Sequence, residues 1–108
     1  MRLELPPAAR KPHRIRLQNV FLRRTDWTGA DLTEANFAGS DFKNANFTDA
    51  DFARANLDGT ILVGADLTGA RNLTVDQLSR AVLDETTRLP DYIDRSAVAA
   101  ARHREPAE

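Results

Sequence analysis

Large apolar side chains recur at every fifth position from Leu17 to Leu67. The eleven positions are Leu17, Leu22, Trp27, Leu32, Phe37, Phe42, Phe47, Phe52, Leu57, Leu62 and Leu67. The residue two places before each is mostly small, as Ala35 and Ala55 are, and Asp or Asn lies between the two in eight of the eleven cases. A three-position pattern that keeps its register over so many copies indicates a tandem repeat.

A period of five fits neither a helix nor a straight strand. In an α-helix, large residues five apart would spiral around the cylinder, and in a strand they would alternate between the two faces. Within one repeat, however, the small and the large residue are two apart, which is strand spacing and places both on one face. The Gly, Asn, Asp and Thr that follow each large residue suit turns. The pattern therefore predicts a coil that turns a corner in every repeat, stacked into a solenoid.

The repeated A(D/N)LXX motif, clearest in ADLTE-ANFAG-SDFKN-ANFTD-ADFAR-ANLDG, resembles the pentapeptide-repeat family. The resemblance spans residues 15–73 and implies an all-β solenoid, a right-handed quadrilateral β-helix with four repeats per coil. Residues 15–73 then make about three coils, positions twenty apart stack, and the eleven large residues form the core. Phe37 to Phe52 fill one layer of it, and the larger ring of Trp27 shields the N-terminal end.

The chain outside the repeats divides into three segments. Residues 1–14 contain a basic cluster around Lys11 and His13 and are expected to be a flexible arm; contact with nucleic acid or an acidic partner is the alternative. Residues 74–90 are expected to form a capping helix and a closing segment. Residues 91–108 are expected to form a tail, either frayed or helical over about Asp91 to His103, with Tyr92 and Ile93 as anchors.

The capping helix is expected where the repeat loses its register. Asn72 stands at the position where the next large residue is due. Thr74 and Gln77 have the spacing of a capping box, which predicts a short helix from about Val75 to Leu83 across the open end of the coil. This segment also resembles the closing segment of many pentapeptide-repeat proteins, and Leu83 to Leu89 is expected to add a last extended piece.

The departures from the repeat indicate a possible interaction face. Phe21 and Ile61 stand in the Asp/Asn column, stacked on Asp41 and pointing outward, with other residues on the same side. The candidate face consists of Phe21, Arg23, Lys43, Ile61 and Val63. Three interpretations remain open: the chain's own termini cover this face, a partner covers it, or its apolar side chains are simply exposed.

Composition excludes several kinds of chemistry. The 108 residues carry a net charge of −1 and no Cys, so disulfides and thiolate sites are impossible. His13 and His103 lie in opposite terminal segments, and the glycines follow the repeat's turn position, not a phosphate-loop motif. The Asp and Asn residues suit turns better than a metal site. We expect no catalytic residues, no cofactor and no metal, hence not an enzyme.

The sequence favours a noncatalytic interaction or scaffold module with an unidentified protein partner. A self-associating unit, such as a homodimer, is one alternative. A DNA-mimicking regulator or protector of DNA gyrase, known within the family, is another; it is disfavoured by the short rod and by eight acids against six bases in residues 15–73. Direct nucleic-acid binding and membrane insertion are not expected, and without a secretory signal or a spanning segment a cytoplasmic location is the default.

Overall fold

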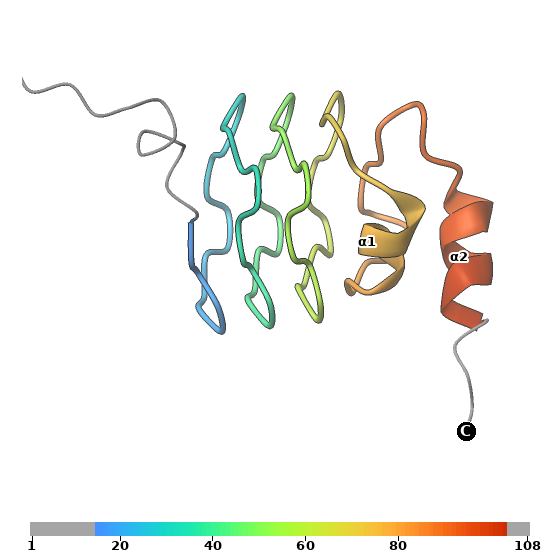
Figure 1. Cartoon of the computed structure of the whole chain (residues 1–108), viewed down its shortest axis with the longest axis horizontal. Coiled ribbons are helices and arrows are strands. Elements are labelled where there is room, and N and C mark those ends of the chain that lie inside the picture. Colours follow the sequence, from blue (N-terminus) through green and yellow to red (C-terminus); the bar gives the residue numbers. More distant parts are fainter. Residues whose placement is uncertain (1–14, 104–108) are drawn as a thin grey trace, which may run out of the picture.

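The computed structural model describes residues 15–103, so the predicted basic arm lies outside the described residues. From residue 15 to residue 71 the chain runs in square coils stacked along one axis (Figure 1). Each side of a coil pairs with the next coil through one parallel bridge, between residues twenty apart in the regular coils, with no longer strand among the described residues. The bridged columns define four sides: first, Arg16–Asn36–Asn56; second, Phe21–Asp41–Ile61–Val82; third, Asp26–Asn46–Asp66–Arg88; fourth, Asp31–Asp51–Arg71.

Every corner has the same backbone geometry. The second residue after each large one has positive φ, between 58° at Asn19 and 73° at Gly39 and Gly64. Six of these eleven corner residues are not glycine, although the left-handed conformation costs an L-residue roughly 1–2 kcal/mol. All eight Asp and Asn residues of the repeat stabilise the corner, because each side-chain Oδ1 accepts a hydrogen bond from the backbone N–H two residues later. Eight of the eleven corners therefore share this side-chain acceptor, and the corners at Asn19, Arg24 and Gly64 form without it.

The small and large residues of each repeat point into the solenoid. Eight of the eleven predicted core residues are at most 2% exposed: Leu32, Phe37, Phe42, Phe47, Phe52, Leu57, Leu62 and Leu67. The other three, Leu17, Leu22 and Trp27, are only partly buried and pack against this cluster from the first coil. Their greater exposure follows from their place at the end of the described stack, where no earlier coil of residues 15–103 covers them.

Aromatic rings fill the middle of the core. Ring centroids lie 4.8 Å apart for Phe37 and Phe42, 5.2 Å for Phe42 and Phe47, and 5.2 Å for Phe47 and Phe52, all with edge-to-face orientations. Trp27 lies on this layer, parallel to the Phe47 ring within 18°, and its indole N–H donates to the Thr25 hydroxyl at 2.7 Å. The hydroxyl partner explains how a polar N–H is accommodated beside an apolar core.

The register changes at Asn72, after which Leu73 supplies the buried side chain, 4% exposed. Helix α1 (Val75–Ser79) follows, with the expected capping box between Thr74 and Gln77. The Gln77 amide also donates to the carbonyls of Phe52 and Ala55, at 3.0 Å each. Leu78 is fully buried in the core cluster. α1 thus lies against the last regular coil (Figure 1).

The helix ends at Ser79, before the expected Leu83, because the chain returns to β pairing. Val82 bridges Ile61, and Arg88 bridges Asp66. The Thr87 hydroxyl donates to the Leu62 carbonyl at 2.8 Å, as the Thr60 hydroxyl does to Phe37 one coil earlier. Residues 81–89 therefore add two sides of a fourth coil to the three expected.

Helix α2 (Arg95–His103) begins later than the expected Asp91 and lies beyond α1 at the C-terminal end (Figure 1). A turn precedes it, in which the Ile93 N–H donates to the Pro90 carbonyl. The Tyr92 hydroxyl donates to the Ala70 carbonyl at 2.5 Å and accepts from the Leu73 N–H. Val98, 2% exposed, belongs to the core cluster. The tail is thus attached to the coil by both apolar and polar contacts.

Candidate functional site

The second side of the solenoid carries the predicted interaction face. Phe21 is 80% exposed, whereas Ile61 and Val63 are half-buried. Val82, 43% exposed, extends the apolar column by one coil. We call Phe21, Ile61 and Val82 the apolar strip. Val82 was not among the predicted face residues, although Ala81-Val82-Leu83 repeats the order of small, bridged and large residues and indicates this position.

A buried carboxylate interrupts the apolar strip. Asp41 is 4% exposed, and its Oδ2 accepts from Arg23 Nε at 2.7 Å while its Oδ1 accepts from the Lys43 N–H at 3.0 Å. Burial alone would raise the pKa of Asp41, but the Lys43 N–H and the Arg23 guanidinium outweigh it and hold this pKa below the ordinary value. Arg23 and Lys43 of the predicted face therefore keep Asp41 ionised between two apolar residues.

Acid is expected to destabilise the protein through Asp41 and other carboxylates. Hydrogen bonds lower the pKa values of Asp26, Asp51, Asp66 and Asp84 as well, chiefly from Thr28, Asn72, Thr68 and Thr86 respectively. A lowered folded-state pKa contributes stability that is complete above the ordinary value, about 3.9, and is lost as the pH falls through the folded value. Urea midpoints should therefore hold from neutral pH down to about 5 and fall below about 4.

The Asp41→Asn variant is the matched comparison for this pH dependence. It retains an acceptor for the Lys43 N–H but cannot titrate, so its midpoint should start lower at pH 7 and fall less on acidification. A wild-type midpoint that rises between pH 5 and pH 3 would contradict the stated direction.

The remaining Asp and Asn residues have structural roles. Asp26, for example, accepts from both the Thr28 N–H and the Thr28 hydroxyl, at 3.0 and 2.6 Å. Within residues 15–103 no three acidic or histidine side chains lie together as a metal site requires. His13 lies outside the described residues, as the side chain of His103 does.

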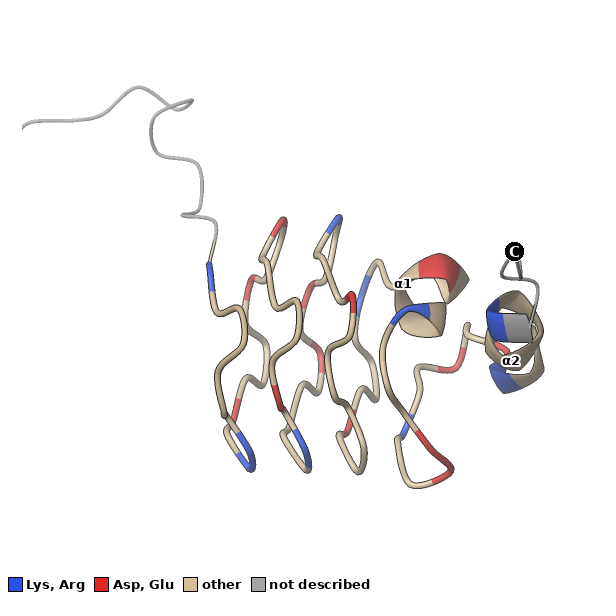
Figure 2. Cartoon of the chain, turned by 90° about the horizontal axis from the view of Figure 1, so that it is seen from below, with Lys and Arg blue, Asp and Glu red and all other residues tan. Residues whose placement is uncertain are grey.

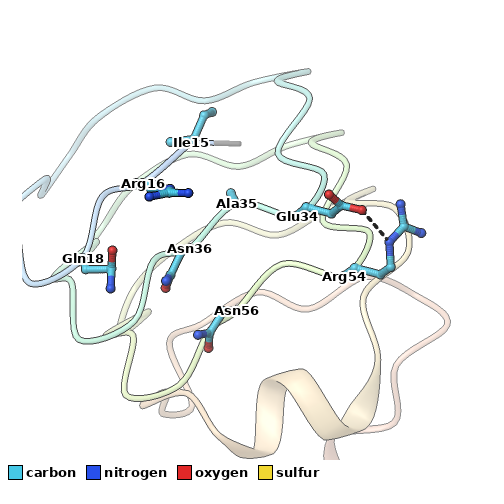
Figure 3. A pocket seen from close by; sticks show the side chains of 8 residues that line it. All are labelled: Ile15, Arg16, Gln18, Glu34, Ala35, Asn36, Arg54 and Asn56. Atoms are coloured by element: carbon cyan, nitrogen blue, oxygen red, sulfur yellow. Dashed lines mark hydrogen bonds and ion pairs between the residues drawn. The ribbon is translucent and has the colours of Figure 1, made fainter. Parts of the chain in front are cut away.

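A polar groove lies on the first side. It measures about 400 Å³ and is lined by Ile15, Arg16, Gln18, Glu34, Ala35, Asn36, Arg54 and Asn56 (Figure 3). Arg54 Nε and Glu34 Oε2 form an ion pair of 3.1 Å at one edge. None of these residues was among the candidate site residues predicted from the sequence, because the groove forms only when successive coils stack.

Charges of both signs are interspersed along the coils (Figure 2). Residues 15–73 contain eight acids and six bases, and neither sign fills a continuous face in this view. None of the helices formed by residues 15–103 is long and apolar enough to cross a lipid bilayer.

These features define the class of protein as a quadrilateral β-solenoid, with polar corners and an aromatic layer in its core. The chain belongs to the pentapeptide repeat family: the model for pentapeptide repeats matches eight copies, over residues 13–49 and 35–71. The resemblance in the sequence is thereby confirmed, and the family's fold is a right-handed β-helix.

Solved structures of the same family resemble this chain. Rfr23, a pentapeptide repeat protein from the cyanobacterium Cyanothece 51142, is 30% identical with a TM-score of 0.61, over 69% of this chain and 50% of that one. A pentapeptide repeat protein from the Arabidopsis thaliana thylakoid lumen is 27% identical with a TM-score of 0.53, over 74% and 63%. The chain thus spans between half and two thirds of these relatives. No curated protein matches it.

Proposed function

We propose that this protein is a noncatalytic interaction module that binds a protein partner through the apolar strip on its second side. The strip is the main support for the proposal, because Phe21 is 80% exposed. The bridged columns on the other three sides carry polar residues at the equivalent positions. Isolated exposed apolar residues are ordinary, but three in one bridged column, with only the buried Asp41 between Phe21 and Ile61, concentrate apolar surface on this side. α1, α2 and the partial fourth coil would act as the C-terminal cap of the module.

The coil beneath the strip is a rigid support. Phe21 pairs with Asp41, and Asp41 with Ile61, through backbone bonds of 2.7–2.9 Å that hold the strip in register. The neighbouring Leu22, Phe42 and Leu62 point into the core. A partner would therefore meet a preformed surface, and binding would cost little conformational entropy.

Site-specific photo-crosslinking tests the proposal. A benzoylphenylalanine at position 21, in protein expressed in its native host, is expected to give a discrete adduct. The same residue at position 26 is the control, because Asp26 holds the equivalent exposed position on the third side. Equal adducts at both positions, or none at position 21, would refute a partner on the second side.

The same crosslinking experiment would also reveal the case in which the partner is a second copy of this chain. Such an adduct would have twice the mass of the chain, and light scattering would show a dimer that Phe21→Glu or Ile61→Lys converts to a monomer. A wild-type monomer at all concentrations would exclude self-association and leave a different protein as the occupant.

A further inference from the structure

The first side differs from the other three in the chemistry of its bridged column. Arg16, Asn36 and Asn56 include no carboxylate, and no apolar residue interrupts them. Each of the other sides has at least one Asp in its column: Asp41 on the second, Asp26 and Asp66 on the third, and Asp31 and Asp51 on the fourth. The polar groove lies over this carboxylate-free column (Figure 3).

The two amides in the groove have fixed orientations. Asn36 Oδ1 accepts from the Ala38 N–H at 3.1 Å, and Asn56 Oδ1 accepts from the Asp58 N–H at 2.9 Å. Because the oxygen of each amide faces its own turn, the Nδ2 group with its two N–H donors faces away from it. Neither Nδ2 group donates to another residue in the range 15–103. Both amides therefore offer donors that the fold itself does not use.

Cations flank these amides. Arg16 is exposed, and its guanidinium makes no hydrogen bond or ion pair with any other described residue. Arg54 donates to Glu34 through Nε, and its side chain is still 69% exposed. Glu34 is the one carboxylate among the lining residues, and Arg54 already binds it. The groove consequently has a surplus of positive charge and of N–H donors, which suits an anionic acceptor.

We propose that this groove binds an acidic peptide segment of a partner protein through its carboxylates. The inference rests on the proposed role as an interaction module and adds a second contact surface to it. The lining residues come from three successive coils, and coils stack about 4.8 Å apart, so the donors form a row along the rod. Such a row complements several carboxylates on one extended chain, and Arg16 provides the planar donor fork that carboxylates prefer.

Fluorescence anisotropy with the full chain tests the proposal. The probe is a labelled peptide of alternating Glu and Ser, compared with one of alternating Gln and Ser. The Glu peptide is expected to bind more tightly than the Gln peptide and to be released by salt. If the two peptides bind equally, or if neither binds, the proposal is wrong. Binding of citrate or phosphate without binding of the Glu peptide also overturns it.

Isosteric variants locate the site, because the fold uses Asp and Asn interchangeably in the bridged columns. Asn36→Asp and Asn56→Asp keep the turn acceptor but replace outward donors with negative charge, and each should weaken binding of the Glu peptide at least about tenfold. Asn46→Asp on the third side adds the same charge with the same turn bond, and should leave binding nearly unchanged. Equal weakening by all three would show only a general charge effect and would refute the groove.

A comparison of two arginine variants, one inside the groove and one outside it, gives a check that does not depend on the amides. Arg16→Gln should weaken the binding about tenfold, whereas Arg71→Gln, which removes the same charge from a bridged position on the fourth side, should not. Unchanged affinity in Arg16→Gln would overturn the assignment. None of these substitutions touches Phe21, so failure here and failure of crosslinking at position 21 are separate results.

Discussion

Replacing Phe47 with alanine is expected to lower the free energy of unfolding by about 3–5 kcal/mol. The Phe47 ring is fully buried and contacts the rings of Trp27, Phe37, Phe42 and Phe52, at centroid distances of 5.2–6.5 Å. Truncation would leave a cavity where four aromatic neighbours meet, and two of them belong to the adjacent sides of the same coil. The bridged backbone cannot collapse into this space without breaking pairs to the neighbouring coils.

Urea unfolding followed by circular dichroism measures this loss. Phe47→Leu is the first control, because Leu is the usual residue at this position of the repeat, and it should cost clearly less than alanine. Phe21→Ala is the second: a residue 80% exposed should change stability by less than about 0.5 kcal/mol. Equal losses for Phe47→Ala and Phe21→Ala would mean that the aromatic layer is not the core.

Replacing Leu78 with alanine is expected to lower the free energy of unfolding by about 2–5 kcal/mol. Leu78 is the fully buried residue of α1 and belongs to the core cluster of the solenoid. Its loss would also loosen α1, whose Gln77 amide donates to Phe52 and Ala55. The effect should therefore appear as lower stability of the whole molecule and not as fraying of one short helix.

The control within the same helix is Asp76→Asn. Asp76 is exposed and pairs with Arg80 at 3.2 Å across one turn, a surface contact that contributes at most about 0.5 kcal/mol. The two variants are compared by thermal unfolding. A wild-type unfolding temperature in Leu78→Ala would show that α1 is not part of the cooperative core.

The repeat region was predictable because each of its positions has one dominant physical role. The apolar residue fills the interior, the small residue is buried beside it, and Asp or Asn accepts from a backbone N–H in the turn. All three roles are local, so residue type alone reveals them. The spacing of twenty between bridged residues came from the family resemblance, because five-residue periodicity does not state how many corners close a coil.

The C-terminal part was harder to predict because its pairing is not periodic. Val82 and Arg88 bridge residues 21 and 22 positions earlier, instead of twenty. The capping box located the start of α1, but its end depends on the pairing of Val82 with Thr60, which is a tertiary contact. For the same reason the helix predicted from Val75 to Leu83 was four residues longer than α1.

The two candidate sites also differ in whether residue type alone reveals them or whether they depend on tertiary contacts. Phe21 and Ile61 were visible as exceptions to a regular column. The groove was not, because it depends on the neighbourhood of Arg16, Asn36 and Arg54 across three coils. The free donors of Asn36 and Asn56 follow from which atom faces the turn, and composition contains no trace of that choice.

In the regular coils the interval between bridged positions is always twenty residues, so the length of the solenoid can change independently of its two ends. Every regular coil presents the same backbone donors and acceptors to the next, so residues 35–54 can in principle be duplicated or deleted without altering either end of the stack. A duplication would lengthen the rod by about 4.8 Å and repeat the outward residues of that coil in order. In-frame duplication of one coil would therefore change the length and the surface pattern together, and would leave α1 and α2 unchanged.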